Sequence, residues 1–194
     1  MSDQVYCYPP DFTVLINKLD VQDGGRLDAI ERAFVVQRMR EAIPTGNFNL
    51  THLRAIHRHL FQDVYDWAGE LRSVEIAKGK SQFQFRRYIE TGMADVHRRL
   101  VGWRYLQGLD TETFAVRAGE IIGDLNYVHP FREGNGRTQA LYLAQLAAQA
   151  GHPLDLRLIV RAEWLAASIA AHRSDYQPFA ACILAALAPG PPSP

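Results

Sequence analysis

The sequence has few cysteines, no excess of charge of either sign and no long hydrophobic run. Its two cysteines, Cys7 and Cys182, lie at opposite ends of 194 residues without the spacing of a metal site or a redox pair. Twenty-one basic residues balance twenty-one acidic ones, so no overall attraction to nucleic acid or an anionic membrane is expected. No segment reaches the roughly 18 apolar residues of a membrane span, and the first residues lack the basic and apolar regions of a signal peptide. We therefore expect a soluble cytoplasmic protein without direct contacts to nucleic acid or membrane, and leave delivery into another cell open.

Helical periodicity dominates the rest of the chain. Hydrophobic residues make up 47% of the sequence, which is enough for one sizeable core. Apolar residues recur at helical spacing in residues 26–40, 50–61, 84–103, 110–125, 137–151, 161–171 and 174–187. Partial alternation in LRSVEIAKGKSQFQF, residues 71–85, predicts one short hairpin around Gly79. We predict an all-α domain of about seven or eight helices over residues 13–187. The N-terminal extension, residues 1–12, and the Pro-rich tail, residues 188–194, are expected to be poorly ordered.

One stretch between two predicted helices, HPFREGNGRTQ at residues 129–139, carries the groups of an anion site. The backbone amides of residues 133–136 precede a helix, so several lack helical partners and the helix dipole adds positive character. Gly134 and Gly136 permit left-handed backbone and a close approach of phosphate oxygens. Arg137 adds a charge-assisted contact to a phosphate. This stretch therefore predicts a phosphate-binding turn, to which we also assign Thr138.

The remaining residues of this stretch indicate what happens to the phosphate. Glu133 would repel a phosphate unless a cation lies between them, and Mg²⁺ is the natural bridge. Asn135 can donate its amide to a non-bridging oxygen, and His129 can accept a proton near neutral pH. Phe131 is expected to point inward and anchor the loop. We infer in-line transfer of a phosphorus group to a hydroxyl, with His129, Asn135 and Arg137 as catalytic residues.

The string HPFREGNGR resembles the signature of Fic-domain proteins. The similarity to bacterial stand-alone members extends to NKLDVQD near residue 17 and to HLRAIHRHLFQDVYDWAGELRSVEI from residue 52. It implies a mostly helical Fic fold and transfer of AMP from ATP to a hydroxyl side chain of a target protein. By position, His129 resembles the base of the family, Phe131 its anchor and Glu133 its Mg²⁺ ligand, and residues 134–137 resemble its phosphate-binding turn. The hairpin resembles the family's flap, which places Lys78 and Gly79 near the ligands.

The sequence departs from the family pattern at Ala140, where a second arginine usually contacts the terminal phosphate of ATP. Two alternatives to AMP transfer therefore stay open. One is transfer of phosphate or another nucleotidyl group by the same site, and the other is a non-catalytic module that binds nucleotide or a partner. The inhibitory motif of the family is absent from this sequence. Either a separate small antitoxin supplies it, as in toxin and antitoxin pairs, or this protein needs none, and we favour the antitoxin. Toxin members modify type II topoisomerase subunits, which are the first targets to consider.

Overall fold

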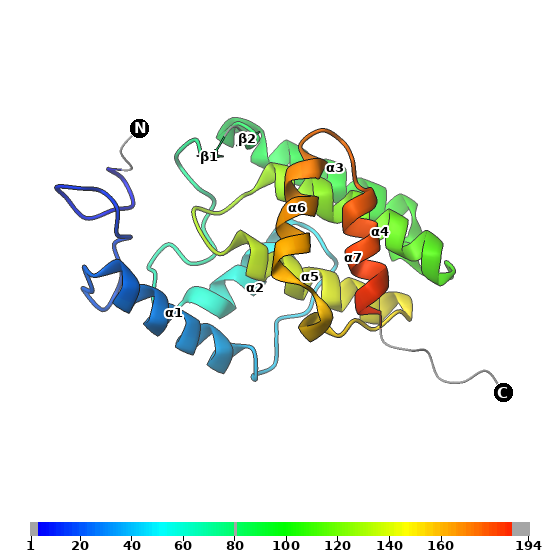
Figure 1. Cartoon of the computed structure of the whole chain (residues 1–194), viewed down its shortest axis with the longest axis horizontal. Helices are drawn as coiled ribbons and strands as arrows, with labels where there is room; N and C mark the ends of the chain where they lie inside the picture. The colour runs from blue at the N-terminus through cyan, green and yellow to red at the C-terminus, as the bar shows by residue number, and fades with distance from the viewer. Residues whose placement is uncertain (1–3, 80, 188–194) are drawn as a thin grey trace.

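The fold is a helical bundle with one small hairpin, as the sequence predicts. The structure, a computed structural model, describes residues 4–79 and 81–187 (Figure 1). Within these ranges it contains seven α-helices. They are α1 (Gly24–Arg38), α2 (Leu50–Phe61), α3 (Ile89–Gly102), α4 (Thr111–Val128), α5 (Asn135–Ala150), α6 (Arg161–Ala171) and α7 (Gln177–Ala186). Among these described residues, no helix combines the length and the apolar character needed to cross a membrane.

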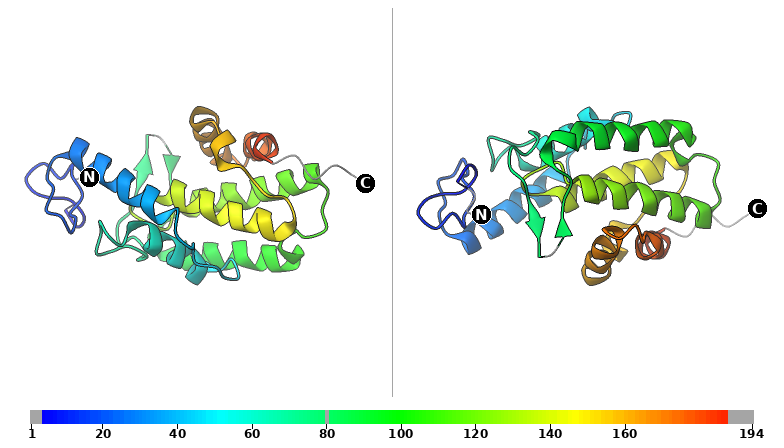
Figure 2. Two further views of the ribbon diagram at one scale, coloured as in Figure 1. Left: turned by 90° about the horizontal axis from the view of Figure 1, so that it is seen from below. Right: turned by 90° about the horizontal axis from the view of Figure 1, so that it is seen from above.

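Helices α3, α4 and α5 lie side by side along the long axis of the molecule, and α6 and α7 cross them on one side (Figure 2). Helix α4 is the centre of the core, since ten of its residues are buried. Two glycines let α4 approach its neighbours closely. A Cβ on Gly119 would lie 2.9 Å from the backbone nitrogen of Ala180, and a Cβ on Gly123 would lie 2.3 Å from the ring of Tyr176. This packing fixes the end of α4, from which the HPFREGNGR loop departs.

The residues that precede α1 are better ordered than the sequence suggests. Tyr6 and Cys7 are buried, and Cys7 forms an isolated antiparallel bridge with Leu15. The ring of Tyr6 meets the ring of Trp67 edge-on at a centroid distance of 5.6 Å. The expectation of a poorly ordered first dozen residues is therefore wrong for residues 6 and 7, because aromatic packing and main-chain bonding hold them. The predicted Pro-rich tail, residues 188–194, lies outside the described residues.

The hairpin around Gly79 consists of β1 (Ala77–Lys78) and β2 (Ser81–Gln82), paired antiparallel. The helix predicted from residue 84 begins later, because Phe85 is extended with ψ 136° and Arg86–Tyr88 forms a 3₁₀ turn before α3. The last helix also begins later than predicted, at Gln177 instead of residue 174, with a proline in its first turn. The later start of α3 lengthens its connection to the hairpin. This connection is held to the end of α4 by the hydrogen bond from the backbone N–H of Gln84 to the Tyr127 carbonyl.

Candidate active site

His129 ends α4, and one of its ring nitrogens makes no hydrogen bond to the described residues. Its backbone adopts the left-handed conformation with φ 47°, which stops the helix immediately before Pro130. Its Nδ1 lies 3.0 Å from the carbonyl oxygen of Asn126. Because a carbonyl can only accept, Nδ1 carries the proton, and Nε2 has the lone pair of a base. Burial lowers the pKa of His129 to about 4, with smaller contributions from the charges of Arg72 and Lys78. The imidazole is therefore neutral near pH 7.

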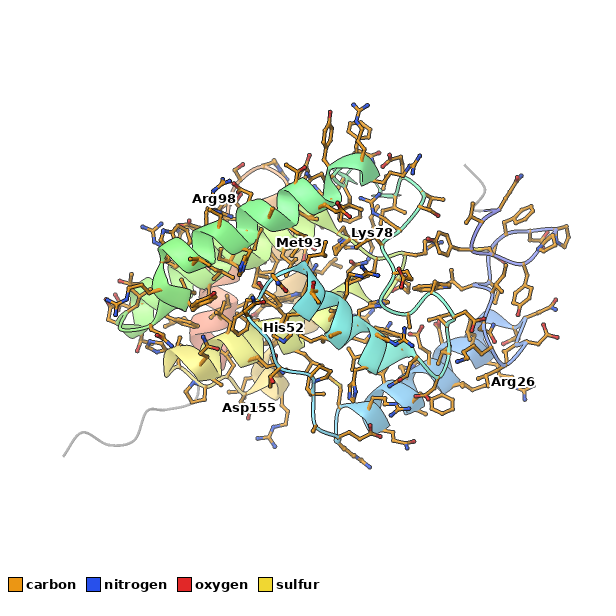
Figure 3. The ribbon with its side chains drawn as sticks, turned by 180° about the vertical axis from the view of Figure 1, so that it is seen from behind. Arg26, His52, Lys78, Met93, Arg98 and Asp155 are labelled. Carbon is orange, nitrogen blue, oxygen red and sulfur yellow. The ribbon has the colours of Figure 1, made fainter. Side chains whose placement is uncertain are left out.

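The hairpin covers this histidine. Phe83, which directly follows β2, is buried and stacks on His129 with ring centroids 3.7 Å apart and an interplanar angle of 18°. The ring of Phe83 also meets that of His172 at 5.2 Å. Lys78, labelled in Figure 3, lies on β1, and its charge is among those that lower the pKa of His129. The predicted flap residue Lys78 is thus electrostatically coupled to the predicted base, whereas Gly79 lies at the exposed tip with φ 61°, where an added Cβ would meet no atom within 4 Å.

The turn after His129 is shaped by aromatic packing. Phe131 is fully buried and stacks on His57 at 3.9 Å, which confirms its expected inward direction. Gly134 has φ 79°, and a Cβ there would lie 2.4 Å from the ring of Phe61, so only glycine fits. Gly136 is different, because it lies in the first turn of α5 and a Cβ there would meet no atom within 4 Å. The backbone at Gly136 is open to a ligand.

The N-terminus of α5 offers donors to an anion. Within the part of the chain that the structure describes, the backbone N–H groups of residues 135–137 have no hydrogen-bond acceptor, while the N–H of Gly134 bonds the Glu133 carboxylate. Arg137 lies in this first turn with its guanidinium carbon 4.7 Å from the centroid of the Phe61 ring. The turn therefore combines open amides, the helix dipole and one arginine, as an anion site requires.

Two predicted phosphate contacts need correction. The amide of Asn135 is buried and bonds the backbone of Phe131 at both ends, since Oδ1 accepts from the N–H at 3.0 Å and Nδ2 donates to the carbonyl at 2.8 Å. The hydroxyl of Thr138 is fully buried and donates to the Gly134 carbonyl at 3.0 Å. Neither side chain is available to a phosphate in this structure. Asn135 and Thr138 instead hold the turn in shape.

The carboxylate of Glu133 has the exposure that a magnesium ligand needs. Its side chain is 50% exposed, and Oε1 accepts the Gly134 N–H at 2.9 Å. Oε2 has no hydrogen bond within residues 4–79 and 81–187. In the same ranges, no group of three or more His, Cys, Asp or Glu side chains could hold a metal by itself. A cation here would take one protein carboxylate and complete its shell with substrate oxygens and water, which is the usual pattern for Mg²⁺.

Two residues that support the site were missed as functional candidates. His57 is buried, accepts the Gly69 N–H at Nδ1, and so donates from Nε2 to the Glu133 carbonyl at 3.0 Å. Burial lowers its pKa to about 4, which keeps it neutral. The sequence does not show this role, because nothing in the spacing of the helix 50–61 identifies a partner of His57 in a distant loop.

Arg72 is the second of these residues, and its side chain is fully buried. Its guanidinium donates to the carbonyls of His129 at 2.8 Å and of Gln84, so it ties the start of the loop after α4 to the segment that follows the hairpin. Its own N–H also bonds the Pro130 carbonyl at 2.9 Å. Burial lowers the pKa of this arginine. A charged residue in an alternating segment normally indicates an exposed position, so the sequence pattern conceals this role.

Comparisons with known proteins point to one family. The model of the Fic/DOC family matches residues 47–147, just over half of the chain. A probable protein adenylyltransferase of Sinorhizobium fredii is 39% identical over 176 residues, which are 90% of this chain and 91% of that protein. The protein adenylyltransferase VbhT of Bartonella schoenbuchensis is 42% identical over 82% of this chain, which spans 34% of VbhT. The crystal structure of BepC from Bartonella tribocorum with bound AMPPNP superposes with a TM-score of 0.88, at 26% identity over 98% of this chain and 99% of that one.

Proposed function

The chain belongs to the Fic/DOC family, and we propose that it is a protein adenylyltransferase that transfers AMP from ATP to a hydroxyl side chain of a target protein. The observation that carries this proposal is the arrangement of His129 and the α5 N-terminus. A neutral histidine with an oriented lone pair precedes a turn whose amides and Arg137 can bind phosphates. Similarity to proteins named protein adenylyltransferases, and to a fold neighbour that binds AMPPNP, supports the same chemistry.

The residues suggest the following step. His129 Nε2 takes the proton of the target hydroxyl as that oxygen forms a bond to the α-phosphorus of ATP. The bond from the α-phosphorus to the bridging oxygen breaks, and pyrophosphate leaves with the electron pair. The amides at residues 135–137 and the Arg137 guanidinium stabilise the negative charge that the phosphate oxygens carry in the transition state. The Asn126 carbonyl holds the imidazole in the required tautomer throughout.

We propose that Glu133 holds Mg²⁺, which would supply positive charge to the phosphate oxygens. The exposed carboxylate and its uncommitted oxygen support this assignment. Lys78 and the hairpin would present the target, whose backbone can pair with an edge of β1 or β2. Type II topoisomerase subunits are the first targets to test. A separate antitoxin would restrain the activity in the cell.

Ala140 lies one helical turn after Arg137, where the family usually has a second arginine. Loss of one charged contact to a phosphate weakens ATP binding by about 1.5 to 3 kcal/mol, or about ten to a hundredfold. We therefore propose AMP transfer with reduced use of ATP. Transfer of phosphate or another nucleotidyl group by the same site, and a non-catalytic role in binding nucleotide or a partner, are the alternatives.

The test is incubation of the purified chain with a lysate and ATP labelled at either the α or the γ phosphorus. Label on protein from the α position alone supports AMP transfer, and mass spectrometry then identifies the target. Label from the γ position alone would show phosphate transfer. ATP binding without any labelled protein would favour the non-catalytic alternative.

A further inference from the structure

Glu31 is a buried carboxylate that the catalytic assignments above do not use. It lies in the middle of α1, outside the segment that the Fic/DOC family model matches, and only 6% of the residue is exposed. A charged side chain is almost never buried unless it is paired. Its partners therefore indicate what it does.

Each oxygen of Glu31 has its own partner. Oε1 forms an ion pair with Arg137 Nη1 at 2.6 Å, and Oε2 accepts a hydrogen bond from the Tyr65 hydroxyl at 2.5 Å. Burial and the bond to Glu31 raise the pKa of Tyr65, so its phenol is protonated and donates near neutral pH. Tyr65 is itself fixed by stacking on Trp67 at 4.3 Å. The carboxylate thus cannot turn away from the arginine without losing a second bond.

The ion pair with Glu31 restrains the guanidinium from one side, whereas the other side makes only a long ion pair to Glu133 among the described residues. Arg137 lies over the ring of Phe61, and the same ring packs against Gly134 in the phosphate-binding turn. The Nε and Nη2 groups of Arg137 make no hydrogen bond to the described residues, and Nη2 lies 3.9 Å from the Glu133 carboxylate. The free donors of the arginine therefore lie on the side of the turn, where the phosphates are expected.

A contribution to stability alone is a weak explanation for this pair. Desolvation of two charges offsets most of the Coulomb attraction, and buried pairs are often no more stabilising than apolar residues of the same volume. In contrast, an Arg137 side chain that is already restrained loses less conformational entropy when a phosphate binds, and this directly favours binding.

We propose that Glu31, held by Tyr65, is a positioning residue that fixes the guanidinium of Arg137 for the phosphates of the nucleotide. This inference rests on the proposed nucleotide site. It gives α1 a part in the active site that the motif itself does not contain.

The first test measures the arginine directly and needs no activity. In wild type, nuclear magnetic resonance should show slow rotation of the Arg137 guanidinium, with its signal assigned by its loss in Arg137→Lys. Glu31→Gln should speed this rotation at least about tenfold, because the ion pair is lost. Asp28→Asn, which removes an exposed carboxylate from the same helix, is the matched control and should leave the rotation unchanged. Unchanged rotation in Glu31→Gln would overturn the proposal even if the chain proves to transfer no AMP.

The second test places the effect on the nucleotide. Glu31→Gln should weaken binding of ATP about tenfold by calorimetry and raise KM for ATP more than it lowers kcat. In an Arg137→Ala background the same substitution should have almost no effect, because Glu31 acts through the arginine. If Glu31 were purely structural, Glu31→Gln would weaken ATP binding by the same factor in both backgrounds. That result would contradict the proposed role, and so would ATP binding that Glu31→Gln leaves unchanged. Failure of AMP transfer alone would count against the proposed function and not against this positioning.

Discussion

The lowered pKa of His129 depends on burial of its imidazole ring under Phe83, and Phe83→Ala tests that dependence. Phe83 stacks on the imidazole at 3.7 Å and is itself 6% exposed, so its removal admits water to one face of the ring. Burial is the largest cause of the lowered pKa. The nearby charges of Arg72 and Lys78 remain in the variant and still disfavour the protonated form. We therefore expect the pKa of His129 to rise from about 4 part of the way to 6.5.

The sign and size of the effect on activity follow from the role of His129 as a base. Only the neutral imidazole accepts a proton, so activity falls as pH drops through the pKa. At pH 5.5 the neutral fraction is about 97% in wild type, and would be about 10% if Phe83→Ala restored the ordinary pKa in full. The acid limb of kcat/KM should accordingly move to higher pH in the variant.

The assay is the pH dependence of single-turnover AMP transfer, together with titration of the His129 ring signals by nuclear magnetic resonance. Phe85→Ala is the matched control, because Phe85 is two residues away and 52% exposed. It should leave the profile as in wild type. Thermal denaturation at pH 8 verifies that each variant is folded. A His129 that titrates near 6.5 in wild type, or at the same pH in wild type and Phe83→Ala, would refute the reasoning.

Three further predictions concern the loop and its support. Ala140→Arg should raise kcat/KM for ATP by about ten to a hundredfold, because the arginine restores a charged contact to a phosphate. Initial rates at low ATP concentration measure kcat/KM, and an unchanged value would contradict this prediction. Gly134→Ala should lower the free energy of unfolding by about 1 to 3 kcal/mol, because residue 134 has a positive φ and its new Cβ would overlap the ring of Phe61. Gly136→Ala should not lower it, because a Cβ there meets no atom within 4 Å. Urea titration compares the two variants, and equal losses of stability would refute this geometry. The buried His57 has a folded pKa of about 4 against 6.5 when unfolded, so its stabilisation is complete above pH 6.5 and is lost as pH falls from 6.5 to 4. The drop in stability across that window should be about 3 kcal/mol larger in wild type than in His57→Gln, which keeps the similar contribution of His129. Denaturant titrations of both proteins measure it, and equal drops would contradict a buried, neutral His57.

The sequence predicted the local features of the site well. Helix α2 begins and ends at the predicted residues, and the inward Phe131 and the left-handed Gly134 have the predicted burial and conformation. Helical periodicity predicts the first of these features, and residue type within a tight turn predicts the other two. The rings that Phe131 and Gly134 meet, those of His57 and Phe61, are distant in the chain and were not predicted. Asn135 and Thr138 were harder, because a short polar side chain at a helix N-terminus can serve either a ligand or the backbone. Residue type alone does not distinguish a ligand from the backbone as the partner. The packing of the folded loop determines which partner the side chain has.

The residues that the sequence concealed act across the fold. Glu31, His57 and Arg72 each hold part of the 129–137 loop from an element that is distant in sequence. In one sequence, a glutamate in an amphipathic helix has the same appearance whether it faces solvent or a buried arginine. Tertiary packing decides between these two environments, and the hydrophobic periodicity of the helix carries no information about the result. The N-terminal segment was misjudged for the same reason, since Tyr6 is held by the distant Trp67.

The central claim is that His129 is the base of an AMP transfer. It is tested most directly by comparing wild type with His129→Ala in transfer of label from α-labelled ATP to the target protein. Both proteins should bind ATP with similar affinity by calorimetry and unfold at similar temperatures, because Asn135 and the turn that binds the phosphates keep their own contacts. We expect labelled target with wild type and none with His129→Ala. Undiminished transfer by the folded His129→Ala variant would contradict it.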